Sequence, residues 1–279
     1  MRLSIVTINY NNLAGLQKTV DSILHQTLTD YEWIVIDGCS TDGSREYLEQ
    51  YQSHYAYWCS EPDKGIYNAI NKGLSHAKGE YVQFLNSGDW LYDRLTLEKA
   101  FEQINGQSDI YYGDMMQVNG NENPNDNDDR KHNLNPIVYP DELGFLFFPY
   151  NNICHQAAFY RRSLFDGNPY DESFSIVSDW AMNLNLLFKG ATFKHLNQFI
   201  VYYDNCGRSS AADQRHHEER TAAFEKYVPE QVRIDVKKYE KKYYFLRRRK
   251  STRWIIDHAI SFSQWIDKLL TRKEYRHIQ

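Results

Sequence analysis

The sequence predicts an α/β protein whose central sheet is mostly parallel and is flanked by helices. Short apolar runs typical of buried strands alternate with segments of helical periodicity through the first ninety residues, and each of these strands ends in a polar loop. The chain has 279 residues, of which 42% are hydrophobic and 15% aromatic. That is enough for one large core with an appendage.

The first elements form a strand, a helix and a second strand. The apolar run at residues 3–8 predicts a buried strand, and the polar residues 9–12 end it. Residues 13–26 carry apolar side chains at helical spacing, and residues 31–36 form a second apolar run. We therefore expect a β-α-β unit.

The alternation continues as far as residue 89. A turn-rich loop at 37–44 precedes a helix at 45–52, and a further helix is expected at 65–77. The strand expected at 81–85 leads into the polar loop 86–89. Parallel sheets bind ligands beyond the carboxyl ends of their strands, and the polar loops lie at those ends.

The rest of the chain carries weaker signals. Residues 119–136 are rich in Asn and Asp and predict an excursion from the core. A strand is expected at 153–160, a helix at 178–188, and mainly helical structure at 215–279. No sustained apolar run of membrane-spanning length and no secretory leader is recognised, so we expect a cytoplasmic protein that is neither exported nor membrane-spanning.

Charge is unevenly distributed along the chain. The net charge is −5, yet residues 233–279 hold fourteen Lys or Arg against five Asp or Glu. The basic run 247–250 leads into apolar and aromatic residues, which predicts an amphipathic tail. The tail either packs on the protein or a second subunit, or binds an anionic membrane surface as a peripheral anchor. Nucleic-acid binding is not expected of an acidic chain without a reader module.

Four cysteines lie far apart and form no C-x-x-C pair, so neither a zinc site nor a disulfide scaffold is indicated. The polar loops instead suit a nucleotide diphosphate sugar. Asp37 follows a buried strand and could accept the imide hydrogen of a uracil ring. Asp89 closes another strand and could bind a divalent cation such as Mg²⁺ or Mn²⁺, which prefer oxygen ligands.

Four segments in order resemble family 2 glycosyltransferases of the GT-A fold, and they are similar to bacterial enzymes that build surface polysaccharides. These segments are Ser4–Asn12, Val35–Ser44, Ser60–Gly73 and Phe84–Asp89. The resemblance implies a catalytic domain at 1–214, with a donor half at 1–115 and an acceptor half at 116–214, and a helical extension at 215–279.

The resemblance also implies roles for single residues. Asp89 would coordinate Mn²⁺ or Mg²⁺. The donor would contact the following residues: Thr7, Asn9, Asp37, Asp63, Lys64, Asn68, Asn86, Ser87 and Arg208. The family often carries carboxylates where this chain has Asn86 and Gly88, so metal binding is expected to be weak and to depend on bound donor. The ordinary alternative for Asp89 is a loop or helix-capping residue.

Asp179 is the candidate catalytic base. It keeps the second carboxylate of the family's acidic pair, whereas Ser178 replaces the first. A carboxylate there would take the proton of the attacking hydroxyl in an inverting transfer, although it could also merely cap a helix. The resemblance places His155, Gln156 and Trp180 by the acceptor; His155 could equally be a structural histidine.

These features predict an inverting, metal-dependent transferase. It would move a hexose or N-acetylhexosamine from a UDP-sugar to a glycan or lipid-linked glycan, as a monomer or a homo-oligomer. An oxidoreductase is disfavoured because no G-x-G-x-x-G follows the first strand. The alternative from another class is a noncatalytic carbohydrate-binding protein, which the departures at Asn86, Gly88 and Ser178 would suit.

Overall fold

The computed structural model describes residues 1–118, 134–143, 147–167, 169–205 and 214–248. Two compact units are present, one from Met1 to Val228 and one that begins at Pro229. Helix α6 (Gln214–Tyr227) belongs to the first unit and α7 (Glu230–Arg248) to the second. The predicted division at residues 214 and 215, between a catalytic domain and an extension, stays a prediction.

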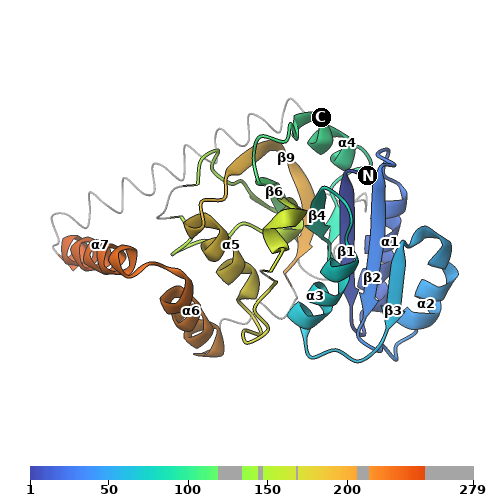
Figure 1. Cartoon of the computed structure of the whole chain (residues 1–279), viewed down its shortest axis with the longest axis horizontal. Helices are drawn as coiled ribbons and strands as arrows, with labels where there is room; N and C mark the ends of the chain where they lie inside the picture. Colours follow the sequence, from blue (N-terminus) through green and yellow to red (C-terminus); the bar gives the residue numbers. More distant parts are fainter. Residues whose placement is uncertain (119–133, 144–146, 168, 206–213, 249–279) are drawn as a thin grey trace. The chain divides into compact units, whose positions relative to one another are not determined.

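One sheet organises the first unit (Figure 1). Its path runs β3-β2-β1-β4-β8-β6-β9-β5, with β7 paired to β6. The strands are β1 (Leu3–Asn9), β2 (Tyr31–Asp37), β3 (Tyr57–Ser60), β4 (Tyr81–Phe84), β5 (Trp90–Leu91), β6 (Ile110–Val118), β7 (Asn135–Ile137), β8 (Ala158–Arg161) and β9 (Phe193–Asp204). Strands β3, β2, β1 and β4 pair in parallel, as the alternation of strands and helices predicts. Beyond them, β8 pairs antiparallel with both β4 and β6, while β6 and β9 are again parallel.

Helices cover both faces of the sheet. They are α1 (Leu13–Leu24), α2 (Ser44–Gln50), α3 (Ile66–His76), α4 (Thr96–Gln103) and α5 (Ser178–Phe188). Alternate residues of β1 point to opposite faces. Leu3 and Ile5 join the buried cluster that α1, α2 and α4 contribute to. Val6 faces α3, where a Cβ added at Gly73 would lie 2.5 Å from Val6 Cγ1, so this glycine allows α3 to approach the sheet closely.

Several sequence expectations need adjustment. The strand expected at 153–160 is shorter, because His155–Ala157 form a 3₁₀ turn before β8. The expected helix at 45–52 ends at Gln50. Of the excursion at 119–136, residues 119–133 lie outside the described residues, whereas Asn135 pairs with Gln117 as part of β7. Helix α5 has the predicted bounds.

The parallel pairing fixes where the candidate site lies. Asn9, the last residue of β1, is in register with Asp37, the last residue of β2, and Asp37 is in register with Ser60, the last residue of β3. Their polar loops therefore meet at one edge of the sheet. In the part of the chain that the structure describes, no helix has the length and apolar character needed to cross a membrane.

Candidate functional site

Asp37 lies at the centre of a hydrogen-bonded corner formed by the ends of β1, β2 and β3. Its side chain is fully buried. Oδ1 accepts hydrogen bonds from Asn9 Nδ2 at 2.7 Å and Ser40 Oγ at 2.6 Å, and Oδ2 accepts from Ser60 Oγ at 2.6 Å and from the Ser40 N–H at 2.9 Å. A carboxylate has about four lone-pair sites. The predicted contact between Asp37 and a nucleobase therefore requires one of these donors to move.

An exposed tyrosine borders this corner. Tyr10 is 58% exposed, and Asp63 lies close to the same backbone: a Cβ at Gly38 would be 3.0 Å from Tyr10 Cδ2 and 2.7 Å from Asp63 Oδ2. Any side chain at position 38 would push these two groups apart. Aromatic faces commonly stack on bases. Tyr10 lies inside the first motif segment, but no role was predicted for it from the sequence.

The other predicted donor residues divide into buried and accessible groups. Thr7 is buried and its Oγ1 accepts a hydrogen bond from Trp33 Nε1. Lys64 is exposed, and its backbone N–H donates to Asn68 Oδ1 at 3.2 Å. Ser87 is half-buried, and its carbonyl accepts a hydrogen bond from Asn12. Arg208 lies outside the described residues. The donor roles of these residues stay predictions.

Asp89 is a buried carboxylate in the loop that follows β4, the strand beside β1 in the sheet. Its Oδ2 accepts a hydrogen bond from Gln156 Nε2 at 2.8 Å, and Oδ1 accepts one from the Asp204 N–H at 3.0 Å. Burial raises the pKa of Asp89 to about 7, although both hydrogen bonds act in the opposite direction. The charge of Asp204 adds to the rise. The environment thus makes the ionised form of Asp89 costly.

The residues around Asp89 are compatible with a hard cation. Carboxylate and amide oxygens are ligands of the kind that Mg²⁺ and Mn²⁺ prefer. Asn86 Oδ1, in the same turn, is buried and has no hydrogen-bond partner in the described structure. No group of three or more His, Cys, Asp or Glu side chains gathers within the described residues in a way that would hold a metal. A cation here would therefore need oxygen atoms of the donor as further ligands.

Asp179 lies in the first turn of α5 and is held at both oxygens. Tyr67 Oη is 3.0 Å from Oδ1, and Asn152 Nδ2 donates to Oδ2 at 2.8 Å. Asn183 in turn donates to Asn152 Oδ1 and accepts a hydrogen bond from Tyr160. Asp179 and Asn152 are partly accessible, whereas Tyr67, Tyr160 and Asn183 are buried. These contacts are what a positioned proton acceptor requires.

The predicted acceptor residues occupy different environments. His155 is 5% exposed; burial lowers its pKa, although Asp179 acts in the opposite direction. Its Nε2 lies 3.3 Å from Asn86 Nδ2. Gln156 donates a hydrogen bond to Asp89, and so lies beside the candidate metal ligand in this structure. Trp180 is 3% exposed, its Nε1 donates to Phe148 O, and the Arg220 guanidinium lies 4.1 Å from its ring centroid. The acceptor roles of these residues stay predictions.

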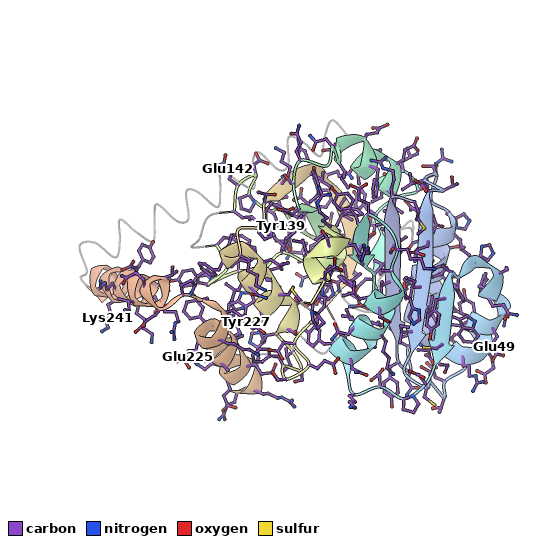
Figure 2. All side chains as sticks on the ribbon, viewed as in Figure 1. Glu49, Tyr139, Glu142, Glu225, Tyr227 and Lys241 are labelled. Carbon is purple, nitrogen blue, oxygen red and sulfur yellow. The ribbon has the colours of Figure 1, made fainter. Side chains whose placement is uncertain are left out.

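Helix α6 holds the segment that leads into α5. Glu219 accepts hydrogen bonds from Ser175 and from the Ile176 N–H, while Lys226 and Tyr227 both donate to Asp171 Oδ2. Figure 2 labels Tyr227, the last residue of α6. Sequence reasoning missed these contacts, because no local pattern links residues so far apart in the chain.

Comparisons with known proteins show the family to which the chain belongs. The family model described as glycosyl transferase family 2 matches residues 4–167. A PGL/p-HBAD biosynthesis glycosyltransferase of Mycobacterium bovis is 30% identical over 211 residues, which are 73% of this chain and 77% of that protein. The putative teichuronic acid biosynthesis glycosyltransferase TuaG of Bacillus subtilis is 39% identical over 105 residues, 36% of this chain and 41% of TuaG.

A solved structure shares the fold. S. aureus TarS 1–349 in complex with UDP-GlcNAc superposes with a TM-score of 0.64 at 19% sequence identity, over 84% of this chain and 69% of that one. The same fragment in complex with UDP gives a TM-score of 0.59 at 21% identity, over 73% of this chain and 60% of that one. The likeness confirms the predicted GT-A fold.

Proposed function

The chain belongs to glycosyl transferase family 2, and from this premise we propose that it is an inverting transferase. It would move a hexosyl or N-acetylhexosaminyl group from a UDP-sugar to a hydroxyl of a glycan or lipid-linked glycan. The observation that carries the proposal is Asp179, a partly accessible carboxylate whose two oxygens are anchored by Tyr67 and Asn152.

In this mechanism Asp179 takes the proton of the acceptor hydroxyl as the hydroxyl oxygen forms its bond to the anomeric carbon. The bond from that carbon to the diphosphate breaks on the opposite face, so configuration inverts. General base catalysis of this kind typically contributes about 10²–10⁴-fold. A divalent cation held by Asp89, together with donor oxygens, would neutralise charge on the departing diphosphate.

The choice of a UDP-sugar has two supports. TarS, which shares the fold, is known in complex with UDP and with UDP-GlcNAc. In this chain the exposed Tyr10 ring, next to Gly38 and Asp63, offers a surface on which a base could stack. A role in polysaccharide synthesis is proposed because TuaG carries teichuronic acid biosynthesis in its name. Attachment of the basic tail at 247–279 to a membrane is part of the proposal and concerns residues mostly outside the described ones.

Isothermal titration calorimetry tests the donor assignment. UDP, GDP and NAD are titrated into the protein with Mn²⁺ and then with excess chelator. We expect UDP to bind and the chelator to weaken its binding. Binding of GDP in preference to UDP would overturn the choice of nucleotide. Lack of binding by all three would favour the noncatalytic alternative.

Replacing Asp179 tests the chemical role. Asp179→Asn keeps the shape of the side chain but removes its basicity, so kcat should fall by about 10²–10⁴-fold while UDP affinity stays within twofold. Transfer is followed as UDP release from UDP-sugars. Asp21→Asn on α1 is the control, since the Asp21 side chain is 76% exposed. Full activity of Asp179→Asn would rule out its role as the base.

A further inference from the structure

The two anchors of Asp179 come from different halves of the candidate site. Asn152 belongs to the loop before β8, in the half predicted to meet the acceptor. Tyr67 is the second residue of α3 and lies inside the predicted donor segment Ser60–Gly73. The carboxylate is therefore tied to the donor side of the site by one hydroxyl group.

The Tyr67 ring is held in place. The side chain is 5% exposed, and its ring stacks on the Tyr170 ring with centroids 5.7 Å apart and an interplanar angle of 11°. Burial, reinforced by the charge of Asp179, raises the pKa of Tyr67 well above its usual value. The phenol consequently keeps its proton throughout the pH range in which a protein works.

This hydroxyl has two acceptors for one proton. Tyr67 Oη lies 2.7 Å from the carbonyl oxygen of Ile176 and 3.0 Å from Asp179 Oδ1. When the Asp179 carboxylate is ionised, the hydroxyl can donate to it. Once the carboxylate has been protonated, the hydroxyl can turn to Ile176 and accept a hydrogen bond from Asp179. A rotating hydroxyl can serve both protonation states in this way.

The same turn of α3 also holds the loop that precedes the helix within this segment. Asn68 accepts a hydrogen bond from the Lys64 N–H and donates one to Glu172, which lies in the segment before α5. Asn71, one turn later, donates to both Tyr170 O and Glu172. The start of α3 is thus fixed to the loop that carries Lys64 on one side and to the segment before the base on the other.

We propose that Tyr67 is a positioning residue that aligns Asp179 with the donor and accommodates both protonation states of its carboxylate. The proposal rests on the proposed function, in which Asp179 is the base. The proton moves from the acceptor hydroxyl to the Asp179 carboxylate, and Tyr67 forms no covalent bond and loses no proton overall. Tyr67 contributes by holding one carboxylate oxygen at a fixed place relative to α3.

Tyr67→Phe tests the proposal, because it removes the hydroxyl and keeps the ring. Tyr170→Phe is the matched control: Tyr170 is a stacked, buried neighbour whose hydroxyl has no hydrogen-bond partner in the described structure. UDP release from UDP-GlcNAc, UDP-glucose and UDP-galactose is measured for each variant, together with UDP affinity and melting temperature. For Tyr67→Phe we expect kcat to fall by about 10- to 100-fold, the value of a hydrogen bond to a charged group.

The KM for the donor and the UDP affinity of Tyr67→Phe should stay within twofold of wild type, as should all constants of Tyr170→Phe. In the Asp179→Asn background, Tyr67→Phe should cause no further loss, because the two residues act as a unit. A wild-type kcat in Tyr67→Phe, an equal loss in Tyr170→Phe, or an additive loss in the double variant would overturn the proposal.

Two outcomes separate this proposal from the proposed function. Full activity of Asp179→Asn would show that Asp179 is not the base, and both proposals would then fail. Loss of activity in Asp179→Asn combined with an unaffected Tyr67→Phe rejects the role of Tyr67 alone. If Tyr67→Phe does not fold, a tyrosine analogue fluorinated beside the hydroxyl at position 67 keeps the ring and makes the hydroxyl more acidic. A kcat that changes at constant KM would then support the proposal, and an unchanged kcat would reject it.

Discussion

A histidine buried between two carboxylates should make the stability of the fold depend on pH. His195 Nε2 lies 2.9 Å from Asp114 Oδ1, and Nδ1 lies 2.9 Å from Asp141 Oδ1. Burial lowers the pKa of His195, but the hydrogen bonds and charges of Asp114 and then Asp141 outweigh it, so the pKa is raised overall. A raised folded-state pKa stabilises the fold fully below the unfolded value of about 6.5, and this contribution is lost as pH rises through the folded value.

The two carboxylates should contribute unequally. The Asp114 side chain is 7% exposed and also accepts the Tyr139 N–H, whereas the Asp141 side chain is 87% exposed. Asp114→Asn keeps an acceptor oxygen but removes the charge, so it should cost about 1–2 kcal/mol at pH 6, the difference between charged and neutral hydrogen bonds. Asp141→Asn should cost less than about 0.5 kcal/mol because water screens an exposed pair.

Urea unfolding at pH 6 and pH 9, followed by circular dichroism, measures both effects. The deficit of Asp114→Asn relative to wild type should be smaller at pH 9 than at pH 6, because the neutral fraction of the imidazole grows with pH and a neutral imidazole can donate from only one nitrogen. An equal deficit at the two pH values would refute the assignment of the pH dependence to this pair. A cost of Asp141→Asn as large as that of Asp114→Asn would refute the argument from burial.

Two further predictions concern packing and surface charge. Gly79→Ala should destabilise the fold by about 1–3 kcal/mol in urea unfolding, because its Cβ would lie 2.5 Å from the backbone nitrogen of Ser4; wild-type stability would show that β1 can shift. Although burial opposes it, hydrogen bonds led by that of Lys226 hold the pKa of Asp171 below its usual value. This contribution is present above the unfolded pKa of about 3.9 and is lost as pH falls. Lys226→Met should therefore cost under about 1 kcal/mol at pH 7 and less at pH 3, and a larger loss at pH 3 would contradict this.

The sequence predicted those parts of the fold whose signals are local. Strands β1, β2 and β4 each combine a short apolar run with a polar loop, and α5 carries its apolar residues at helical spacing. Strand β9 was missed because its twelve residues do not alternate between buried and accessible; its buried residues come instead in the adjacent pairs His195–Leu196 and Ile200–Val201. Its partner β6 lies more than seventy residues earlier, so pairing in three dimensions defines it.

In the candidate site, too, the residues with local sequence signals could be predicted and those defined by long-range contacts could not. Asp37 could be proposed because it ends β2, Asp89 because it closes the polar loop that follows β4, and Asp179 because it lies in the first turn of a helix within a recognisable segment. Asn152 could not be found, because no motif surrounds it and its contact with Asp179 joins different elements. Tyr67 stood inside a recognised segment, but its contact with Asp179 spans 112 positions of the chain.

Three buried carboxylates show why a cation is expected at only one of them. Asp37 is satisfied by hydroxyl and amide donors, and Asp114 contacts the imidazole of His195. Within the described part of the chain, Asp89 accepts hydrogen bonds only from the neutral Gln156 amide and a backbone N–H. Burial raises its pKa to about 7. A divalent ion would compensate the desolvated charge of Asp89. Asp89→Asn should accordingly remove the metal dependence of UDP binding while leaving the nucleobase contacts intact, and UDP calorimetry with and without Mn²⁺ would measure both. An unchanged response to Mn²⁺ would place the ion elsewhere.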